Sequence, residues 1–115
     1  MNVLSIVTLL MLLHTPPQKK VYEMRVTGYH VKADERGVLA EIIQPGRHAS
    51  VSPGCIELLG EKVYVRGYGV FRVNDLTHNR LDDQFGICTM DLATRTKAEA
   101  QAIGNKVSQV VRILP

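Results

Sequence analysis

The stretch KVYVRGYGVFRV, residues 62–73, contains two strand patterns separated by a turn. Lys62 to Val65 alternates polar and apolar side chains, and Val70 to Val73 is rich in β-branched and aromatic residues, which favour strands. The segment Gly67-Tyr68-Gly69 between them predicts a tight hairpin, because glycine adopts positive φ without a steric penalty. This pattern is typical of antiparallel sheet and indicates a β protein.

Similar strand patterns on both sides of this hairpin predict further strands of a small barrel. The first of these strands is the clearest, because Tyr22, Met24 and Val26 alternate with charged or polar residues and so place one face in a core. The expected strands are Val21–Tyr29, Ala49–Val51, Lys62–Val65, Val70–Val73, Ile87–Leu92 and Val107–Leu114. About six short strands and one late helix predict a mainly β fold, a small closed or nearly closed barrel.

The helix is expected between the last two strands. Thr96 and Glu99 fit a capping box, and Gly104 is a natural stop after a helix that runs to about Ile103. The connections are expected to be irregular: a long loop at His30–His48 with at most one short strand near Val38–Ile43, a compact turn or single helical turn at Cys55–Gly60, and a polar surface loop at Leu76–Gly86.

Length and composition allow one folded domain. The chain has 115 residues, of which 45% are hydrophobic and 22% charged, as in ordinary globular proteins. The net charge is +3 and the pI about 9.0. Because the basic residues are scattered, with Lys19-Lys20 the only adjacent pair, we expect no nucleic-acid partner.

Residues 1–17 are interpreted as a signal peptide or membrane tether, followed by the barrel domain at 18–115. Val3 to Leu13 is an apolar run about as long as the core of a signal peptide and too short to span a bilayer, and Pro16-Pro17 then stops any helix. A buried N-terminal strand or helix is the alternative. The leader predicts an exported protein, in the periplasm, cell envelope or outside the cell, that contacts a membrane only through this segment.

The cysteines and histidines suggest no metal site and no cofactor. Cys55 and Cys88 lack the spacing of a redox or zinc motif, and either a disulfide in an exported protein or two buried thiols would suit them. The histidines show no metal-ligand spacing; they are His14, His30, His48 and His78.

Asp75 and Asp91 are the candidate catalytic residues. Asp75 follows the strand Val70–Val73, and Asp91 lies among the apolar residues of Ile87–Leu92. A carboxyl among apolar strand residues is partly desolvated, which raises its pKa and lets it act as a general acid near neutral pH. The alternative is that each aspartate caps a turn by accepting backbone N–H bonds.

The segment Glu57 to Leu114 resembles the 3D domain, named for three aspartates and found in bacterial cell-wall lytic enzymes and stationary-phase secreted proteins. The matching elements are Leu59-Gly60, Val63-Tyr64-Val65, Gly67-Tyr68-Gly69, Val73-Asn74-Asp75, Met90-Asp91-Leu92, Glu99-Ala100, Gly104 and Val110–Leu114. Upstream, Thr27-Gly28-Tyr29 and Val51-Ser52-Pro53 resemble a strand end and a turn of the same family. The order Asp91-Leu92, capped helix, Ile103-Gly104 is also similar to rare lipoprotein A.

This resemblance implies a double-psi β-barrel of six strands with a carboxylate pair at one rim. The similarity to membrane-bound lytic transglycosylase A further implies cleavage of the bond between MurNAc and GlcNAc in peptidoglycan. An aspartate protonates that bond and then accepts the proton of the sugar's own 6-hydroxyl, which gives a 1,6-anhydro product. By position, Asp91 matches the general acid/base and Asp75 a supporting aspartate.

The sequence departs from the family pattern between and after these aspartates. The loop between Asp75 and Asp91 is longer than usual and resembles the variant in which Asn-Asp is followed by arginine, here Arg80. The third aspartate falls at Arg95, and Asp82-Asp83 offers a rival alignment for the second. Asp91 is preferred because it keeps the step of eight residues to Glu99 and its helix.

Three further residues are candidates for substrate binding. His78 and Arg80 lie in the loop after Asp75 and could bind sugar hydroxyls or a stem carboxylate, although a solvated loop is the alternative. Tyr29 could stack on a sugar ring, or simply pack. We therefore expect a monomer that cleaves peptidoglycan strands; the rival hypotheses are a non-catalytic glycan-binding module of the same fold and a basic nucleic-acid-binding barrel.

Overall fold

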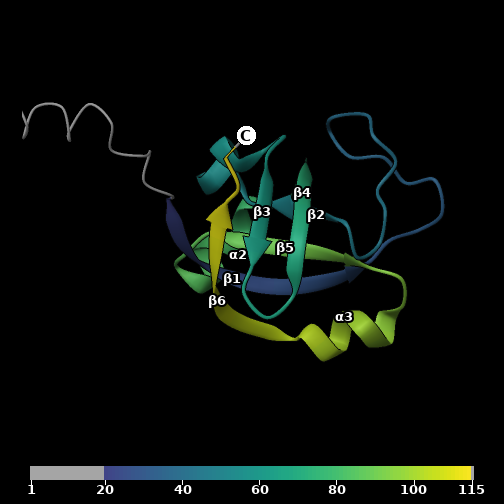
Figure 1. Ribbon diagram of the computed structural model, residues 1–115. Helices are drawn as coiled ribbons and strands as arrows, with labels where there is room; N and C mark the ends of the chain where they lie inside the picture. Colours follow the sequence, from purple (N-terminus) through teal and green to yellow (C-terminus); the bar gives the residue numbers. More distant parts are fainter. Residues whose placement is uncertain (1–19, 115) are drawn as a thin grey trace, which may run out of the picture.

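The structure, a computed structural model, describes residues 20–114; the expected leader lies outside them (Figure 1). The elements follow in the order β1 Val21–His30, β2 His48–Val51, the 3-10 helix η1 Pro53–Leu58, β3 Lys62–Val65, β4 Gly69–Leu76, α2 Asn79–Phe85, β5 Thr89–Thr94, α3 Lys97–Ile103 and β6 Asn105–Arg112. The six predicted strands are all present, with ends displaced by a few residues. The mainly β fold class is confirmed.

The strands close into a barrel in the order β1-β5-β2-β4-β3-β6. The pairs β1–β5 and β2–β4 are parallel, and the other four pairs are antiparallel. Exchanging β1 with β4, β2 with β5 and β3 with β6 reproduces every pairing, so the two halves of the chain are related by a pseudo-two-fold arrangement. A closed barrel of six strands with this pairing is compatible with the double-psi fold that the sequence suggested.

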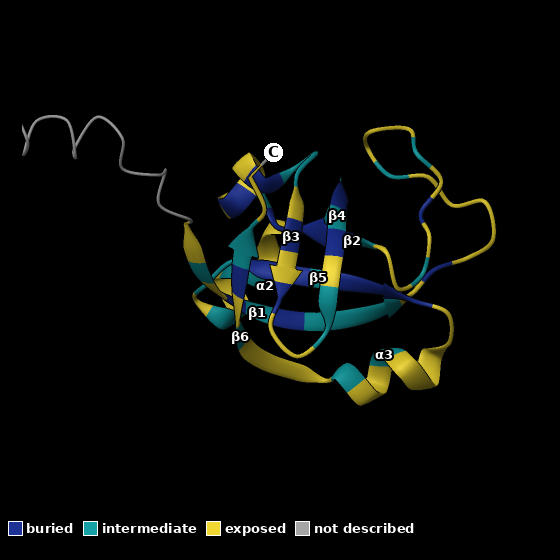
Figure 2. Ribbon diagram, in the orientation of Figure 1, coloured by how far each residue is buried: buried dark blue, intermediate teal, exposed yellow. Residues whose placement is uncertain are grey.

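The barrel interior is filled by aliphatic side chains from alternate positions of each strand. Val26, Met90 and Val51 form one row across β1, β5 and β2, and all three are completely or almost completely inaccessible to solvent. Figure 2 shows this buried centre against a mostly exposed α3 and an exposed loop between β1 and β2. The alternation seen in the sequence therefore identifies the core face of these strands.

Helix α3 packs against β1 through a glycine. A Cβ atom at Gly28 would lie 2.9 Å from Ile103 Cδ1 and 3.0 Å from Ala100 Cα, so only a residue without a side chain allows this contact. The predicted cap is confirmed: the Glu99 amide donates to Thr96 Oγ1 at 3.1 Å. The Glu99 carboxylate in turn accepts from the amide of Arg95 at 3.1 Å.

A second helix corrects the expected loop at Leu76–Gly86. Residues Asn79–Phe85 form α2, which ends at Gly86 with a left-handed φ of 72°. The half-buried Leu81 and Phe85 stand four residues apart on α2, and the Arg25 guanidinium of β1 lies 4.9 Å from the Phe85 ring centroid. The polar composition of the segment hid this short amphipathic pattern. At Val38–Ile43 no strand forms, and an isolated bridge joins Arg36 to Ile42.

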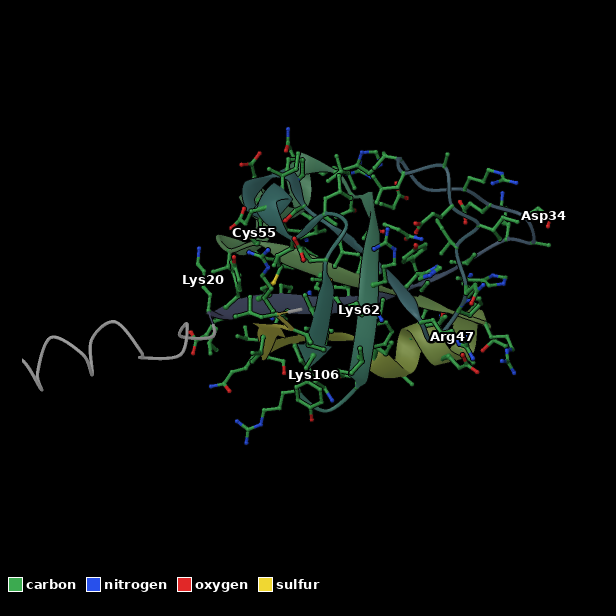
Figure 3. The ribbon with its side chains drawn as sticks, turned by 45° about the horizontal axis from the view of Figure 1, so that its top comes forward. Lys20, Asp34, Arg47, Cys55, Lys62 and Lys106 are labelled. Atoms are coloured by element: carbon green, nitrogen blue, oxygen red, sulfur yellow. A yellow bond between two sulfur atoms is a disulfide. The ribbon has the colours of Figure 1, made fainter. Side chains whose placement is uncertain are left out.

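A disulfide joins η1 to the short segment between α2 and β5. Cys55 in η1 and Cys88 before β5 are bonded, with an S–S distance of 2.02 Å (Figure 3). The Asp82 carboxylate of α2 also accepts from the Gly54 amide at 3.2 Å. The disulfide alternative left open by the sequence is therefore the one found.

Candidate functional site

A row of polar residues crosses four neighbouring strands on the outer face of the barrel. In the register of the sheet, Thr27 of β1 pairs with Asp91 of β5, Asp91 pairs with Ser50 of β2, and Ser50 pairs with Asp75 of β4. We call these four residues the polar row. Because strands lie roughly 4.8 Å apart, the Cα atoms of the two aspartates are separated by about 9–10 Å. The pseudo-two-fold exchange relates Thr27 to Asp75 and Ser50 to Asp91.

A register shift in β4 turns Asp75 toward this row. Ala49 pairs with Val73 but the next residue of β2, Ser50, pairs with Asp75, so Asn74 is the extra residue of a bulge. Without the bulge, alternation from the buried Val73 would direct Asp75 into the core. Asn74 is itself completely buried, and its Nδ2 donates to Glu41 Oε1 at 3.3 Å. The bulge therefore places both aspartates on one face.

Asp91 has the chemical properties of a general acid. Its strand neighbours Met90 and Leu92 point into the core, and the carboxyl itself is largely removed from water. This desolvation raises the pKa of Asp91 from the ordinary 3.8 to about 6, although a hydrogen bond from Thr27 favours the charged form. The Thr27 hydroxyl donates to Asp91 Oδ1 at 2.9 Å. Asp91 can therefore exchange a proton near neutral pH.

Asp75 has a different environment, because it holds a loop. The Val38 amide donates to Asp75 Oδ1 at 3.0 Å. Val38 belongs to the 31–47 loop, which connects β1 to β2 and projects from the barrel with Asp34 near its tip (Figure 3). This contact is the capping role that the sequence left as the alternative, and it leaves Asp75 as a half-buried charge beside Ser50.

Charged and buried contacts fix the base of the 31–47 loop against β4. The Arg72 guanidinium forms a bidentate pair with Glu41, with N···O distances of 2.9 and 2.7 Å, and its other amino group donates to the Gly60 carbonyl at 2.7 Å. This pairing lowers the pKa of Glu41. At Gly37 the loop approaches β4 so closely that a Cβ would lie 2.3 Å from the Asn74 carbonyl oxygen. The loop beside Asp75 is thus firmly anchored.

Tyr29 lies next to the polar row, two residues beyond Thr27 on the same face of β1. Burial raises the pKa of Tyr29 to about 12; the Ser50 hydroxyl beside it opposes this shift, and the negative charges of Asp75, Asp91 and Glu35 add to it. Its hydroxyl is buried but has no hydrogen bond of good geometry within residues 20–114. Tyr29 also packs against Val31, Ile43 and Ala93. It therefore presents a neutral hydroxyl close to both aspartates.

His78 and Arg80 lie at the start of α2, and both are exposed. The structure shows no hydrogen bond or ion pair between either residue and the polar row within residues 20–114, so their substrate-binding roles stay predictions. Asp82 of the rival alignment bonds to η1 and is not in the row.

The sequence analysis missed two members of the polar row. The sequence presents Thr27 only as part of the Thr27-Gly28-Tyr29 resemblance. The pattern that could have identified it is strand alternation, which places Thr27 on the same face as the candidate Tyr29. Ser50 is 4% exposed and stands between Ala49 and Val51, which are inaccessible to solvent. No pattern in the sequence distinguishes this serine from any other small polar residue in a strand.

Within residues 20–114, no three side chains of His, Cys, Asp or Glu are grouped so that they could hold a metal ion. None of the helices described is long and apolar enough to cross a membrane. In comparisons with known proteins, no family model matches the chain, and no curated protein matches it.

Proposed function

We propose that this protein is a peptidoglycan lytic transglycosylase that uses Asp91 as its general acid and base. The observation that carries the proposal is the desolvated carboxyl of Asp91, with its pKa raised to about 6, in one row with a second aspartate. A group that must first donate and later accept a proton works best when its pKa lies near the working pH. Asp91 has this property because its carboxyl is desolvated on the outer face of β5.

In the proposed reaction, protonated Asp91 gives its proton to the oxygen that links MurNAc to GlcNAc. The bond between that oxygen and C1 of MurNAc breaks, and the GlcNAc end leaves as an alcohol. The 6-hydroxyl oxygen of the same MurNAc then bonds to C1, and its proton passes to the Asp91 carboxylate. The product is a 1,6-anhydro sugar, Asp91 is again protonated, and no water is consumed.

Asp75 is proposed to support the positive charge that develops at the sugar. It is one strand beyond Ser50 on the same face, so its charge acts across the row rather than at the bond that breaks. Tyr29 contributes a neutral hydroxyl beside both carboxyls, and His78 and Arg80 are proposed to bind sugar hydroxyls or stem carboxylates. We also propose that the protein is exported, acts on the cell wall as a monomer, and contacts the membrane through its leader.

A second candidate is a glycan-binding module without turnover. The contact between Asp75 and the Val38 amide favours it, because this aspartate already has a structural task. In this alternative the polar row and the 31–47 loop form a surface of hydroxyl and carboxyl groups that binds sugar.

The test is mass spectrometry of purified peptidoglycan incubated with the full chain, compared with Asp91→Asn and Asp83→Asn. Asp83 is an exposed aspartate of α2 and provides a matched control for the loss of one charge. Anhydro-muropeptides from the wild type and Asp83→Asn, but not from Asp91→Asn, would support the transglycosylase. Release of none by any variant, with all of them still sedimenting with sacculi, would replace it with the binding module.

A further inference from the structure

The two carboxylate oxygens of Asp91 have different surroundings. Oδ1 accepts the hydrogen bond from the Thr27 hydroxyl at 2.9 Å. Oδ2 has no hydrogen-bond partner within residues 20–114, and it is not among the completely buried unpaired atoms. One oxygen is therefore held by the protein, and the other has no protein partner among the described residues.

The strand pairing of the barrel fixes the contact between Thr27 and Asp91. Thr27 and Asp91 are direct partners in the parallel pair β1–β5, so their side chains leave the sheet side by side. Threonine is β-branched and has few χ1 rotamers in a strand, which limits the positions of its hydroxyl. Just before Thr27 along β1, the core residues Met24 and Val26 keep the strand in register.

We propose that Thr27 is a positioning residue that reserves Oδ1 of Asp91 as a hydrogen-bond acceptor, so that Oδ2 carries the proton exchanged with the sugar. A proton on Oδ1 would require the Thr27 hydroxyl to turn round and accept, whereas a proton on Oδ2 leaves the hydrogen bond that the hydroxyl donates intact. Thr27 thus assigns the two oxygens different tasks. The transfer of this proton to the sugar rests on the proposed function, but the preference of the proton for Oδ2 over Oδ1 does not.

Several titratable or charged side chains stand on the same outer face, and their charges could influence the titration of Asp91. They are Arg25 and Tyr29 on β1, His48 on β2, Arg72 and Asp75 on β4, and Glu35 and Glu41 in the 31–47 loop. For Asp91 itself, the effects that shift its pKa are desolvation and the Thr27 hydrogen bond. A change confined to Thr27 therefore reports on that bond.

The experiment compares the full wild-type chain with Thr27→Val and Thr27→Ser. Valine keeps the branched shape and removes the donor, and serine keeps the donor. The carboxyl ¹³C resonance of Asp91, assigned with Asp91→Asn, is followed against pH by NMR, and muropeptide release is measured over the same range. Circular dichroism checks that each variant is folded.

We expect the Asp91 titration midpoint to move to higher pH in Thr27→Val and to stay in place in Thr27→Ser. Maximal muropeptide release should fall about tenfold to hundredfold in Thr27→Val, because a misplaced proton donor loses that much, and its pH limb should move with the midpoint. An unchanged midpoint in Thr27→Val, or an equal change in Thr27→Ser, would overturn the inference. If the wild type releases no muropeptides, the proposed function fails, yet the NMR midpoints still decide the role of Thr27.

Discussion

Asp91 and Asp75 lie on the same outer face of the barrel, separated by a single strand in which Ser50 is the register partner of both. Their environments nevertheless differ. Asp91 is desolvated and accepts a hydroxyl hydrogen bond, whereas Asp75 accepts a loop amide. The row thus combines one proton-exchanging carboxyl with one anchored charge, and this difference leads to separate predictions for the two residues.

Asp91→Asn should stabilise the protein above pH 6. In the wild type, the pKa of Asp91 rises from 3.8 in the unfolded chain to about 6 in the folded protein. Below both values the residue is protonated in both states; between them the unfolded chain releases its proton first, so the wild type loses stability as pH rises. Asparagine does not titrate, so the variant should be more stable by about 2–3 kcal/mol at pH 8 and by little at pH 3. Urea unfolding at both pH values measures this; an equal difference at both would contradict it.

Asp75→Asn should keep the fold, whereas Asp75→Ala should lose about 1 kcal/mol of stability. The asparagine amide oxygen can still accept from the Val38 amide, but alanine leaves that donor without its partner. Thermal unfolding measures the stability of both variants. If Asp75 supports developing positive charge, Asp75→Asn should also reduce muropeptide release, though less than Asp91→Asn; unchanged release would reduce Asp75 to a loop anchor.

Gly37→Ala should move the 31–47 loop away from β4. The added Cβ would meet the Asn74 carbonyl oxygen at 2.3 Å and Asp75 Cβ at 2.9 Å, and strand backbone yields little. We expect a loss of about 1–3 kcal/mol in stability and faster hydrogen exchange at the Val38 amide. Ala33→Ser, at an exposed position of the same loop, is the matched control. Unchanged exchange at Val38 in Gly37→Ala would show that the loop adapts without losing its contact.

Loss of the disulfide should lower stability by about 2–4 kcal/mol, because the bond closes a long loop in the unfolded chain. Cys55 and Cys88 are 33 residues apart, and both contact the core cluster. Denaturant unfolding of the Cys55→Ser, Cys88→Ser double variant, with and without reductant, measures the loss. The reduced wild type and the double variant should have the same free energy of unfolding. A reduced wild type as stable as the oxidised protein would refute this prediction.

Thr96→Ala should cost about 1 kcal/mol, because it leaves the Glu99 amide at the start of α3 without its side-chain acceptor. Thr96→Ser keeps an oxygen at the same position and should retain most of the stability. Thermal unfolding of the three proteins compares them, and equal melting temperatures would argue that water replaces this cap.

The sequence by itself determined the elements whose signals are local. The alternation around Met24 and Val26, the Gly67–Gly69 turn and the Thr96 cap each depend on a few neighbouring residues, and the corresponding strands, hairpin and helix are confirmed. Helix α2 escaped prediction because its apolar pattern consists of little more than Leu81 and Phe85. The prediction of Asp75 and Asp91 as functional residues remains untested, although the structure brings both onto one face.

Only the tertiary structure decided how these elements form a site. The polar row joins residues 27, 50, 75 and 91, which meet through strand pairings between distant parts of the chain. Local side-chain patterns contain no information on such partners. The bulge at Asn74 likewise depends on β2 as its neighbour, and it reverses the face that simple alternation gives Asp75. The desolvation of Asp91 also depends on the residues that neighbouring strands place beside it on the outer face, because burial is a property of all the surrounding elements together.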